Sequence, residues 1–92
     1  MKEISITVFG LVQGVFFRKS TVEKAIELNI TGWVRNRKEG FVEILAQGSE
    51  EELVELLDWS YKGSILARVQ RVEVQWTEAK ESYSNFSILS TK

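Results

Sequence analysis

Hydrophobic and polar positions alternate at the start of the chain. Ile4, Ile6 and Val8 are separated by polar residues, and this period of two predicts a half-buried strand. A loop that contains two glycines is then expected over residues 9–16. Helical spacing follows, because apolar residues recur among charged ones, and it predicts a helix from Phe17 to Leu28.

Three residues form the apolar stripe expected on this helix, namely Val22, Ala25 and Ile26. Asn29 suits the C-terminal cap, because asparagine tolerates the left-handed conformation found there. Two further strands are predicted over residues 31–35 and 41–47, where Gly40 closes the connection, as is typical of a hairpin.

A second helix is predicted after Ser49, which is followed by three glutamates. This pattern is a capping box with acidic residues in the first turn, where the helix dipole favours them. Gly63 ends this helix. Its apolar face is expected to contain Leu53, Leu56, Leu57 and Ser60.

The last two strands are predicted over residues 67–76 and 85–89. In the first of them the step from Val69 to Val72 breaks the alternation, which indicates a bulge near Gln70 and Arg71.

The order of these elements is β-α-β-β-α-β with a short final strand. The handedness rule leaves very few arrangements for this order, and we predict an α+β, ferredoxin-like sandwich with an antiparallel sheet and two helices on one face. Residues 1–92 are expected to form a single domain. Because the first β-α-β unit is parallel, the loop 9–16 and the turn 36–40 should be neighbours at one edge of the sheet.

Composition excludes several kinds of site. The chain has 92 residues, of which 43% are hydrophobic, so it can bury a core without disulfides. It contains no cysteine and no histidine, which excludes thiolate catalysis and metal sites built from these residues. No apolar stretch approaches the roughly 20 residues that span a membrane. We expect a cytoplasmic protein with no metal, no cofactor and no membrane partner.

Charge is unevenly distributed along the chain. The net charge of −1 argues against a general nucleic-acid binder. Residues 10–40 carry a net charge of +3 and the remainder −4. A locally basic segment can hold a small anion, although a chance cluster of solvated charges explains it equally well.

Residues 10–18, with the sequence GLVQGVFFR, connect the first strand to the first helix. The glycines allow the backbone to curl so that successive N–H groups point at one centre, and such a concavity at a helix N-terminus binds phosphate. By itself this is a weak signal, and an ordinary connecting turn explains two glycines better.

Arg18 strengthens the case for an anion site. A cation in the first turn faces the positive end of the helix dipole, at a cost of up to about 1 kcal/mol that a bound anion would remove. Its planar guanidinium can contact phosphate through two nitrogens. The alternative is a solvated arginine whose stem covers Phe17.

Asn36 ends the second strand immediately before the turn. Its amide can point across the sheet edge at whatever the first loop holds. Asparagine also begins turns by bonding to the backbone two residues on, and composition and spacing alone favour this structural role.

Residues 10–18 resemble the signature GxVQGVxFR of the acylphosphatase family, with every fixed position matched. Residues 32–36, with the sequence GWVRN, resemble the second signature, and the similarity extends over essentially the whole chain. The chain departs from the family at Ser64 and Ile65, where proline is common, and at Asn29, where glycine is common.

This resemblance implies hydrolysis of acyl phosphates to a carboxylate and inorganic phosphate. It implies that Arg18 binds the phosphate together with backbone amides of the loop, and that Asn36 orients the attacking water. The side chains of Gln13 and Lys19 are expected to be loop or solvent residues. The phosphate-binding amides are those of Gln13, Gly14, Val15, Phe16 and Phe17.

Two other classes stay open. A related domain occurs within hydrogenase-maturation carbamoyltransferases, which are long multidomain chains, whereas we expect this chain to be complete at Lys92. The other class is a non-enzymatic ferredoxin-like module that binds anions or RNA. An RNA-binding module carries aromatic residues on its exposed sheet face, and here the expected outward residues of the first and third strands include no stacking pair. These outward residues are Ser5, Thr7, Glu43 and Leu45. We therefore expect a monomer whose partners are an acyl phosphate substrate and its phosphate product, with no nucleic acid.

Overall fold

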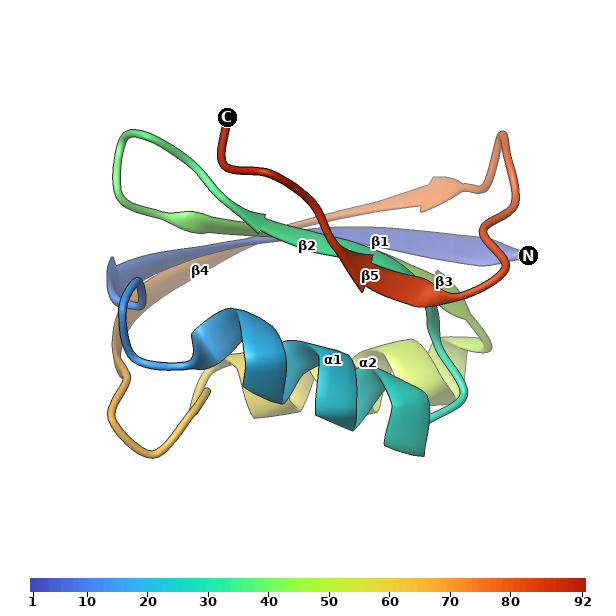
Figure 1. Cartoon of the computed structure of the whole chain (residues 1–92). Coiled ribbons are helices and arrows are strands. Elements are labelled where there is room, and N and C mark those ends of the chain that lie inside the picture. Colours follow the sequence, from blue (N-terminus) through green and yellow to red (C-terminus); the bar gives the residue numbers. More distant parts are fainter.

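Five strands form one sheet, and two helices pack against one of its faces in the computed structural model, which describes residues 1–92 (Figure 1). The strands lie in the order β4-β1-β3-β2-β5. The predicted α+β, ferredoxin-like fold is confirmed. In chain order the elements are β1 (Lys2–Leu11), α1 (Phe17–Glu27), β2 (Thr31–Asn36), β3 (Val42–Gly48), α2 (Glu50–Ser60), β4 (Arg68–Glu78) and β5 (Phe86–Ile88).

The last strand makes the sheet mixed. β5 pairs in parallel with β2, whereas all other neighbouring strands are antiparallel, so the prediction of a purely antiparallel sheet is wrong for β5. The chain crosses from the β4 edge to the β5 edge, and the buried Gln47 holds the crossing segment. Its Oε1 accepts a hydrogen bond from the backbone N–H of Tyr83 at 3.2 Å, and its Nε2 donates to the carbonyl of Glu81.

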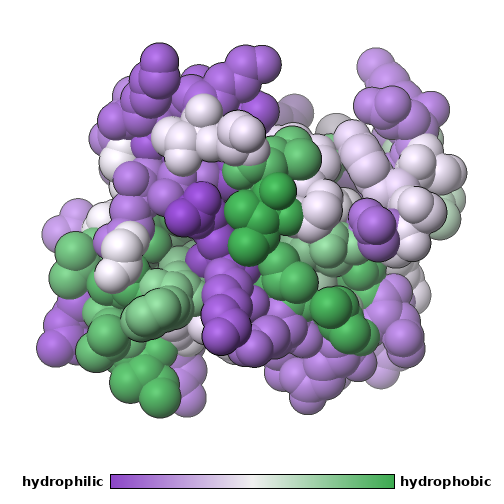
Figure 2. All heavy atoms as spheres, viewed as in Figure 1, coloured by the Kyte–Doolittle hydropathy of each residue, from purple (hydrophilic) through white to green (hydrophobic).

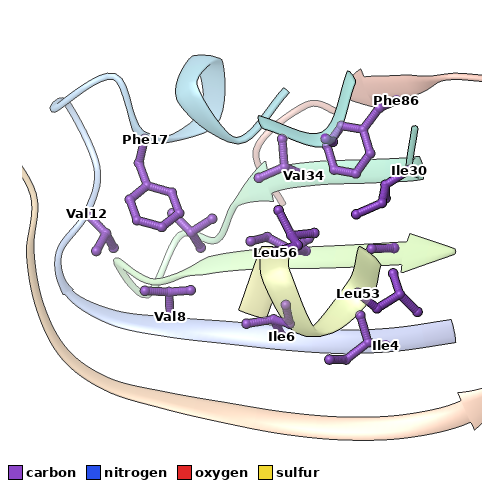
Figure 3. Close-up of a cluster of buried hydrophobic side chains, with 14 of the residues drawn as sticks. Ile4, Ile6, Val8, Val12, Phe17, Ile30, Val34, Leu53, Leu56 and Phe86 are labelled. Atoms are coloured by element: carbon purple, nitrogen blue, oxygen red, sulfur yellow. The ribbon is translucent and has the colours of Figure 1, made fainter. Parts of the chain in front are cut away.

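The hydrophobic core lies between the sheet and the helices (Figure 3). The alternating residues Ile4, Ile6 and Val8 of β1 are fully buried there, as the sequence pattern predicts. Helix α2 contributes Leu53 and Leu56, both inaccessible to solvent, and its predicted capping box at the N-terminus is confirmed. Neither helix is long and apolar enough to cross a membrane.

Helix α1 buries a different stripe from the one predicted. Its buried residues are Phe17, Thr21 and Ala25, whereas Ile26 is 63% exposed. These buried residues are spaced by four, starting from Phe17. The ring of Phe17 at the first helical position therefore determines which face of α1 packs against the core. Thr21 can be buried because its hydroxyl donates to the carbonyl of Phe17 at 2.8 Å. The left-handed conformation predicted for Asn29 is confirmed by its φ of 59°.

Strand β1 is longer than predicted, because a bulge allows its pairing with β4 to continue. Phe9 lies opposite Arg71 and Gly10 lies opposite Val69, which leaves Gln70 as the extra residue. The bulge predicted near this position is confirmed. The predicted loop 9–16 is therefore too long, and the connection between β1 and α1 contains only residues 12–16.

The sheet face opposite the helices carries an aromatic pair. The rings of Phe9 and Phe41 lie 5.1 Å apart, and this pair lies beyond the four outward residues considered from the sequence, none of which is aromatic. An arginine guanidinium group lies over each of these two rings. Arg71 Cζ is 3.9 Å from the centroid of Phe9, and Arg37 Cζ is 5.8 Å from that of Phe41, distances at which cation–π attraction operates.

Candidate active site

The β1–α1 loop, residues 12–16, presents a row of unpaired backbone donors. Gly14 and Phe16 have φ values of 73° and 63°, so the chain turns sharply before the helix begins. No backbone N–H from Gln13 to Lys19 donates a hydrogen bond to another group of the protein. The helix N-terminus has no side-chain cap and no acidic residue in its first turn. Donors of this kind at a helix N-terminus attract anions.

Arg18 occupies the first turn of α1 without any carboxylate partner. Its side chain takes part in none of the ion pairs or hydrogen bonds of the structure. The residue is half-buried. Its positive charge therefore adds to that of the helix dipole instead of offsetting another side chain.

Asn36 is the last residue of β2, and its side chain lies on the helix-facing side of the sheet. The residue is 9% exposed, and Oδ1 is buried without a hydrogen-bond partner. No side-chain bond joins it to the following turn, so the structural role considered for this asparagine is not found. Its backbone is fixed from the other side, because its carbonyl accepts from the N–H of Lys92 at 3.2 Å.

A cavity of about 390 Å³ brings these groups together. Arg18 and Asn36 both line it, although they come from different elements, so the predicted proximity of the first loop and the hairpin is confirmed. Ile88 of β5 also lines the cavity, and the sequence indicated no site role for it. The lining residues are Val12, Gly14, Phe16, Phe17, Arg18, Lys19, Asn36 and Ile88.

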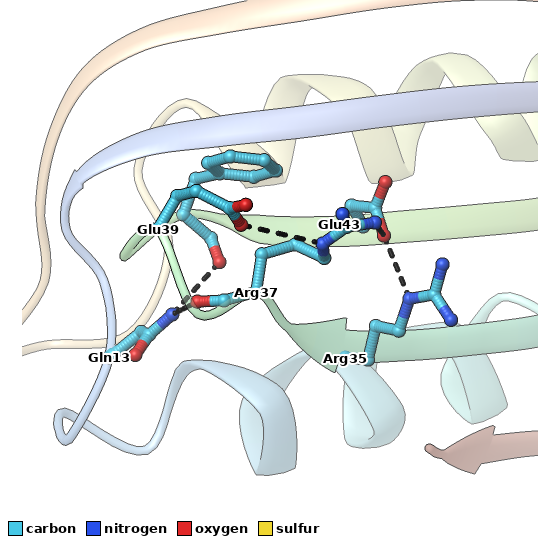
Figure 4. A network of polar contacts seen from close by, with 6 residues as sticks. Gln13, Arg35, Arg37, Glu39 and Glu43 are labelled. Atoms are coloured by element: carbon cyan, nitrogen blue, oxygen red, sulfur yellow. Dashed lines mark hydrogen bonds and ion pairs between the residues drawn. The ribbon is translucent and has the colours of Figure 1, made fainter. Parts of the chain in front are cut away.

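Two of the predicted phosphate-binding residues, Gln13 and Val15, do not line the cavity. Each can contribute its backbone amide only, because both side chains are used elsewhere. Gln13 Nε2 donates to the carbonyls of Arg37 at 2.7 Å and Phe41 at 3.0 Å (Figure 4). Gln13 thereby joins the β1–α1 loop to the hairpin turn that follows Asn36, a contact that sequence reasoning missed.

The side chain of Val15 is buried in the core, with 8% exposed. The Val15 carbonyl accepts a hydrogen bond from the hydroxyl of Ser64 at 2.6 Å. The β1–α1 loop is thus held on one side by the hairpin and on the other by the connection between α2 and β4.

The other arginines near the site are neutralised by carboxylates (Figure 4). Arg35 Nε and Arg37 Nη1 lie 2.8 Å and 3.1 Å from the same oxygen of Glu43, and Arg37 Nε lies 3.6 Å from Glu39. Burial raises the pKa of the Glu43 carboxyl, but hydrogen bonds and attraction from the two arginines outweigh it and hold this pKa below its ordinary value of 4.5. The cations that line the cavity, Arg18 and Lys19, have no such partner.

Comparisons with known proteins identify the family of the chain. The family model described as acylphosphatase matches residues 4–88. An acylphosphatase of Shewanella amazonensis is 49% identical over 88 residues, which are 96% of this chain and 97% of that protein. The chain belongs to the acylphosphatase family. It is accordingly an enzyme of that family, and the matched range contains both Arg18 and Asn36.

Solved structures extend the similarity to three dimensions. The crystal structure of acylphosphatase from Bacillus subtilis matches with a TM-score of 0.94 at 37% identity and covers 97% of this chain and 99% of that chain. Full-length HypF in its phosphate- and nucleotide-bound form matches with a TM-score of 0.88 at 29% identity. There the match covers 98% of this chain but 12% of HypF. This chain is therefore similar to the whole of one acylphosphatase and to one segment of HypF.

The contact of Gln13 with the hairpin predicts a cost in stability when it is removed. We expect Gln13→Ala to lower the free energy of unfolding by about 1–2 kcal/mol, because two hydrogen bonds to partly buried carbonyls are lost. Gln13→Glu should cost more, since a carboxylate has no donor for the same carbonyls. Urea unfolding measures both. The matched control is Gln75→Ala on the exposed surface of β4, and equal midpoints for Gln13→Ala and wild type would contradict the structural role.

The lowered pKa of Glu43 predicts a pH-dependent contribution to stability. The folded-state pKa lies below the ordinary value of 4.5, so the contribution is fully present above about pH 4.5 and is lost as the pH falls through the folded pKa. The difference in unfolding free energy between wild type and Glu43→Gln should therefore shrink as the pH is lowered from 6 to about 3. Glu73→Gln, at an exposed ion pair, should show no such trend. A difference between wild type and Glu43→Gln that is constant with pH would contradict the lowered pKa of Glu43.

Proposed function

We propose that the protein hydrolyses acyl phosphates, with Arg18 and the amides of the β1–α1 loop binding the phosphate and Asn36 orienting the attacking water. The observation that carries this proposal is one cavity lined by Arg18, which has no carboxylate partner, and by Asn36, whose side chain makes no hydrogen bond to the protein. A phosphate and a water molecule would satisfy both groups.

Binding of the phosphate follows from the local electrostatics. The amides that donate to no protein group surround the start of α1, where the helix dipole is positive. Arg18 provides two parallel donors for the phosphate oxygens, which a lysine cannot reproduce. Lys19 also lines the cavity and adds a second positive charge.

The chemistry requires few catalytic groups. The leaving carboxylate has a conjugate acid of pKa about 4, so it departs without a general acid. Phosphoryl transfer passes through a loose transition state in which charge stabilisation and positioning account for most of the catalysis. Arg18 and the loop amides provide the first contribution, and Asn36 provides the second.

Asn36 is suited to hold the water because it lines the cavity and its side-chain amide makes no hydrogen bond to the protein. A water bound to this amide would direct a lone pair at the phosphorus. No carboxylate or other evident base lines the cavity. The resemblance to the family implies that the proton of the water goes to an oxygen of the substrate phosphate.

The direct test is a comparison of leaving groups. Acetyl phosphate should be hydrolysed to acetate and phosphate in the presence of a chelator, because the charge stabilisation comes from Arg18 and the amides. A sugar phosphate should be hydrolysed poorly or not at all, since an alkoxide must leave and no carboxylic acid, histidine or tyrosine lines the cavity to protonate it. Strict dependence on added magnesium, or similar rates for both substrates, would contradict the mechanism.

Two substitutions separate the proposed roles of Arg18 and Asn36. Arg18→Lys keeps the charge but loses the two-pronged geometry, so phosphate affinity and turnover should both fall steeply. Asn36→Ala should lose turnover but keep the phosphate site. Inorganic phosphate should therefore raise the Tm of Asn36→Ala as much as it raises that of wild type. It should raise the Tm of Arg18→Lys much less. The stabilisation expected at a hundredfold excess over Kd is about 2.7 kcal/mol.

Each variant must first show a cooperative unfolding transition, which controls for misfolding. Because the side chain of Asn36 makes no hydrogen bond to the protein, Asn36→Ala removes no such bond and should fold normally. Full activity of Asn36→Ala would refute its role, and undiminished stabilisation of Arg18→Lys by phosphate would refute that of Arg18.

A further inference from the structure

A second cavity, of about 330 Å³, lies beside the first. Phe16 lines both of them, so the two cavities adjoin at this residue of the β1–α1 loop. The second cavity contains no charged residue. Its lining residues are Val15, Phe16, Ser20, Ser64, Ile65 and Leu66.

Large apolar side chains are exposed around this second cavity. Ile65 is 98% exposed, Phe16 is 69% exposed and Leu66 is 58% exposed. Figure 2 shows hydrophobic residues gathered at the lower left, in the region where Figure 1 places the β1–α1 loop and the connection between α2 and β4. Isolated apolar residues are ordinary on a surface, whereas a contiguous group beside a polar site indicates binding.

The fold holds these apolar residues in place. Phe16 has a φ of 63° and a ψ of 23°, a left-handed conformation that is unfavourable for a bulky residue. The hydroxyl of Ser64 bonds to the Val15 carbonyl at 2.6 Å and fixes the α2–β4 connection against the β1–α1 loop. Gly63 packs so closely on the Phe17 ring that a Cβ there would overlap it. The two backbone segments that border the apolar cavity are therefore fixed against each other.

We propose that this second cavity is the acyl subsite, and that contacts with Phe16, Ile65 and Leu66 favour acyl phosphates whose chains are apolar and longer than acetyl. The inference rests on the proposed function, because it assigns the part of the substrate that the phosphate site leaves unbound. With the phosphate on Arg18, an acyl chain that extends beyond the first cavity must cross its border. At Phe16 that border opens into further apolar space, whereas Ile88, the other exposed apolar residue of the border, lines no second cavity.

Contact with the acyl chain should change KM and not kcat. The chain beyond the carbonyl is unchanged between the bound substrate and the transition state, so its binding is uniform across the reaction. One fully covered methylene corresponds to about a fourfold change in affinity, and partial cover on an open surface gives less. The KM of wild type should therefore fall stepwise from acetyl to butyryl to hexanoyl phosphate.

The test compares these three substrates in wild type and in the double variant Ile65→Ser/Leu66→Ser. Both residues are exposed, so the variant should fold and should hydrolyse acetyl phosphate as wild type does. For hexanoyl phosphate its KM should rise about three- to tenfold, with kcat unchanged. The matched control is Ile26→Ser, an exposed isoleucine at the far end of α1, which should leave the KM series unchanged.

Three results would overturn the subsite. The first is a KM that does not depend on chain length in wild type. The second is a double variant whose KM series equals that of wild type. The third is a loss of chain-length dependence in Ile88→Ser but not in the double variant, which would place the acyl chain against β5. If wild type hydrolysed no acyl phosphate, including acetyl phosphate, the proposed function would fail instead, so the two failures are distinguishable.

Discussion

The geometry of the site depends on the burial of one ring, that of Phe17. This side chain is 1% exposed, and its ring lies 5.4 Å from that of Trp59. Phe17 is also the first residue of α1, so the same contact that stabilises the core determines where the helix begins and how it is rotated. The next residue is Arg18. Successive residues on a helix are turned by about 100°, so a buried Phe17 keeps the arginine out of the core and at the rim of the cavity.

Much of the fold could be predicted because local patterns and the tertiary structure agree. The alternation in β1, the capping box at Ser49 and the bulge at Gln70 each have a local cause that the sequence displays. The parallel pairing of β5 has no such local cause. The position of this three-residue strand depends on the path of the segment that crosses from β4 to β2. The stripe on α1 was mispredicted at Ile26 because Thr21 is buried through a hydrogen bond that hydropathy does not register.

The candidate site shows the same division between local and non-local information. Arg18 could be singled out from its place in the first turn of the helix, Gly14 from the loop before it, and Asn36 only from the resemblance to the family. The structure places all three on one cavity. Ile88 could not be assigned to the site from the sequence, since its position at the cavity follows from the pairing of β5 with β2. The side chain of Gln13 was expected in the loop, yet its bonds to carbonyls of the hairpin join segments far apart in the sequence. Such contacts depend on the assembled fold, so no pattern within the loop could reveal them.

The backbone bonds that join the hairpin to the last residues have a consequence for the order of folding. The N–H of Lys92 bonds to the carbonyl of Asn36, and the N–H of Lys38 bonds to the carbonyl of Lys92. Closing a loop between such distant segments is entropically costly, and contacts of this kind form late. The cavity is complete only when β5 has docked beside β2, because Ile88 lines it. Recovery of the site during refolding would therefore report the last step of assembly, after the central strands and the helices have packed.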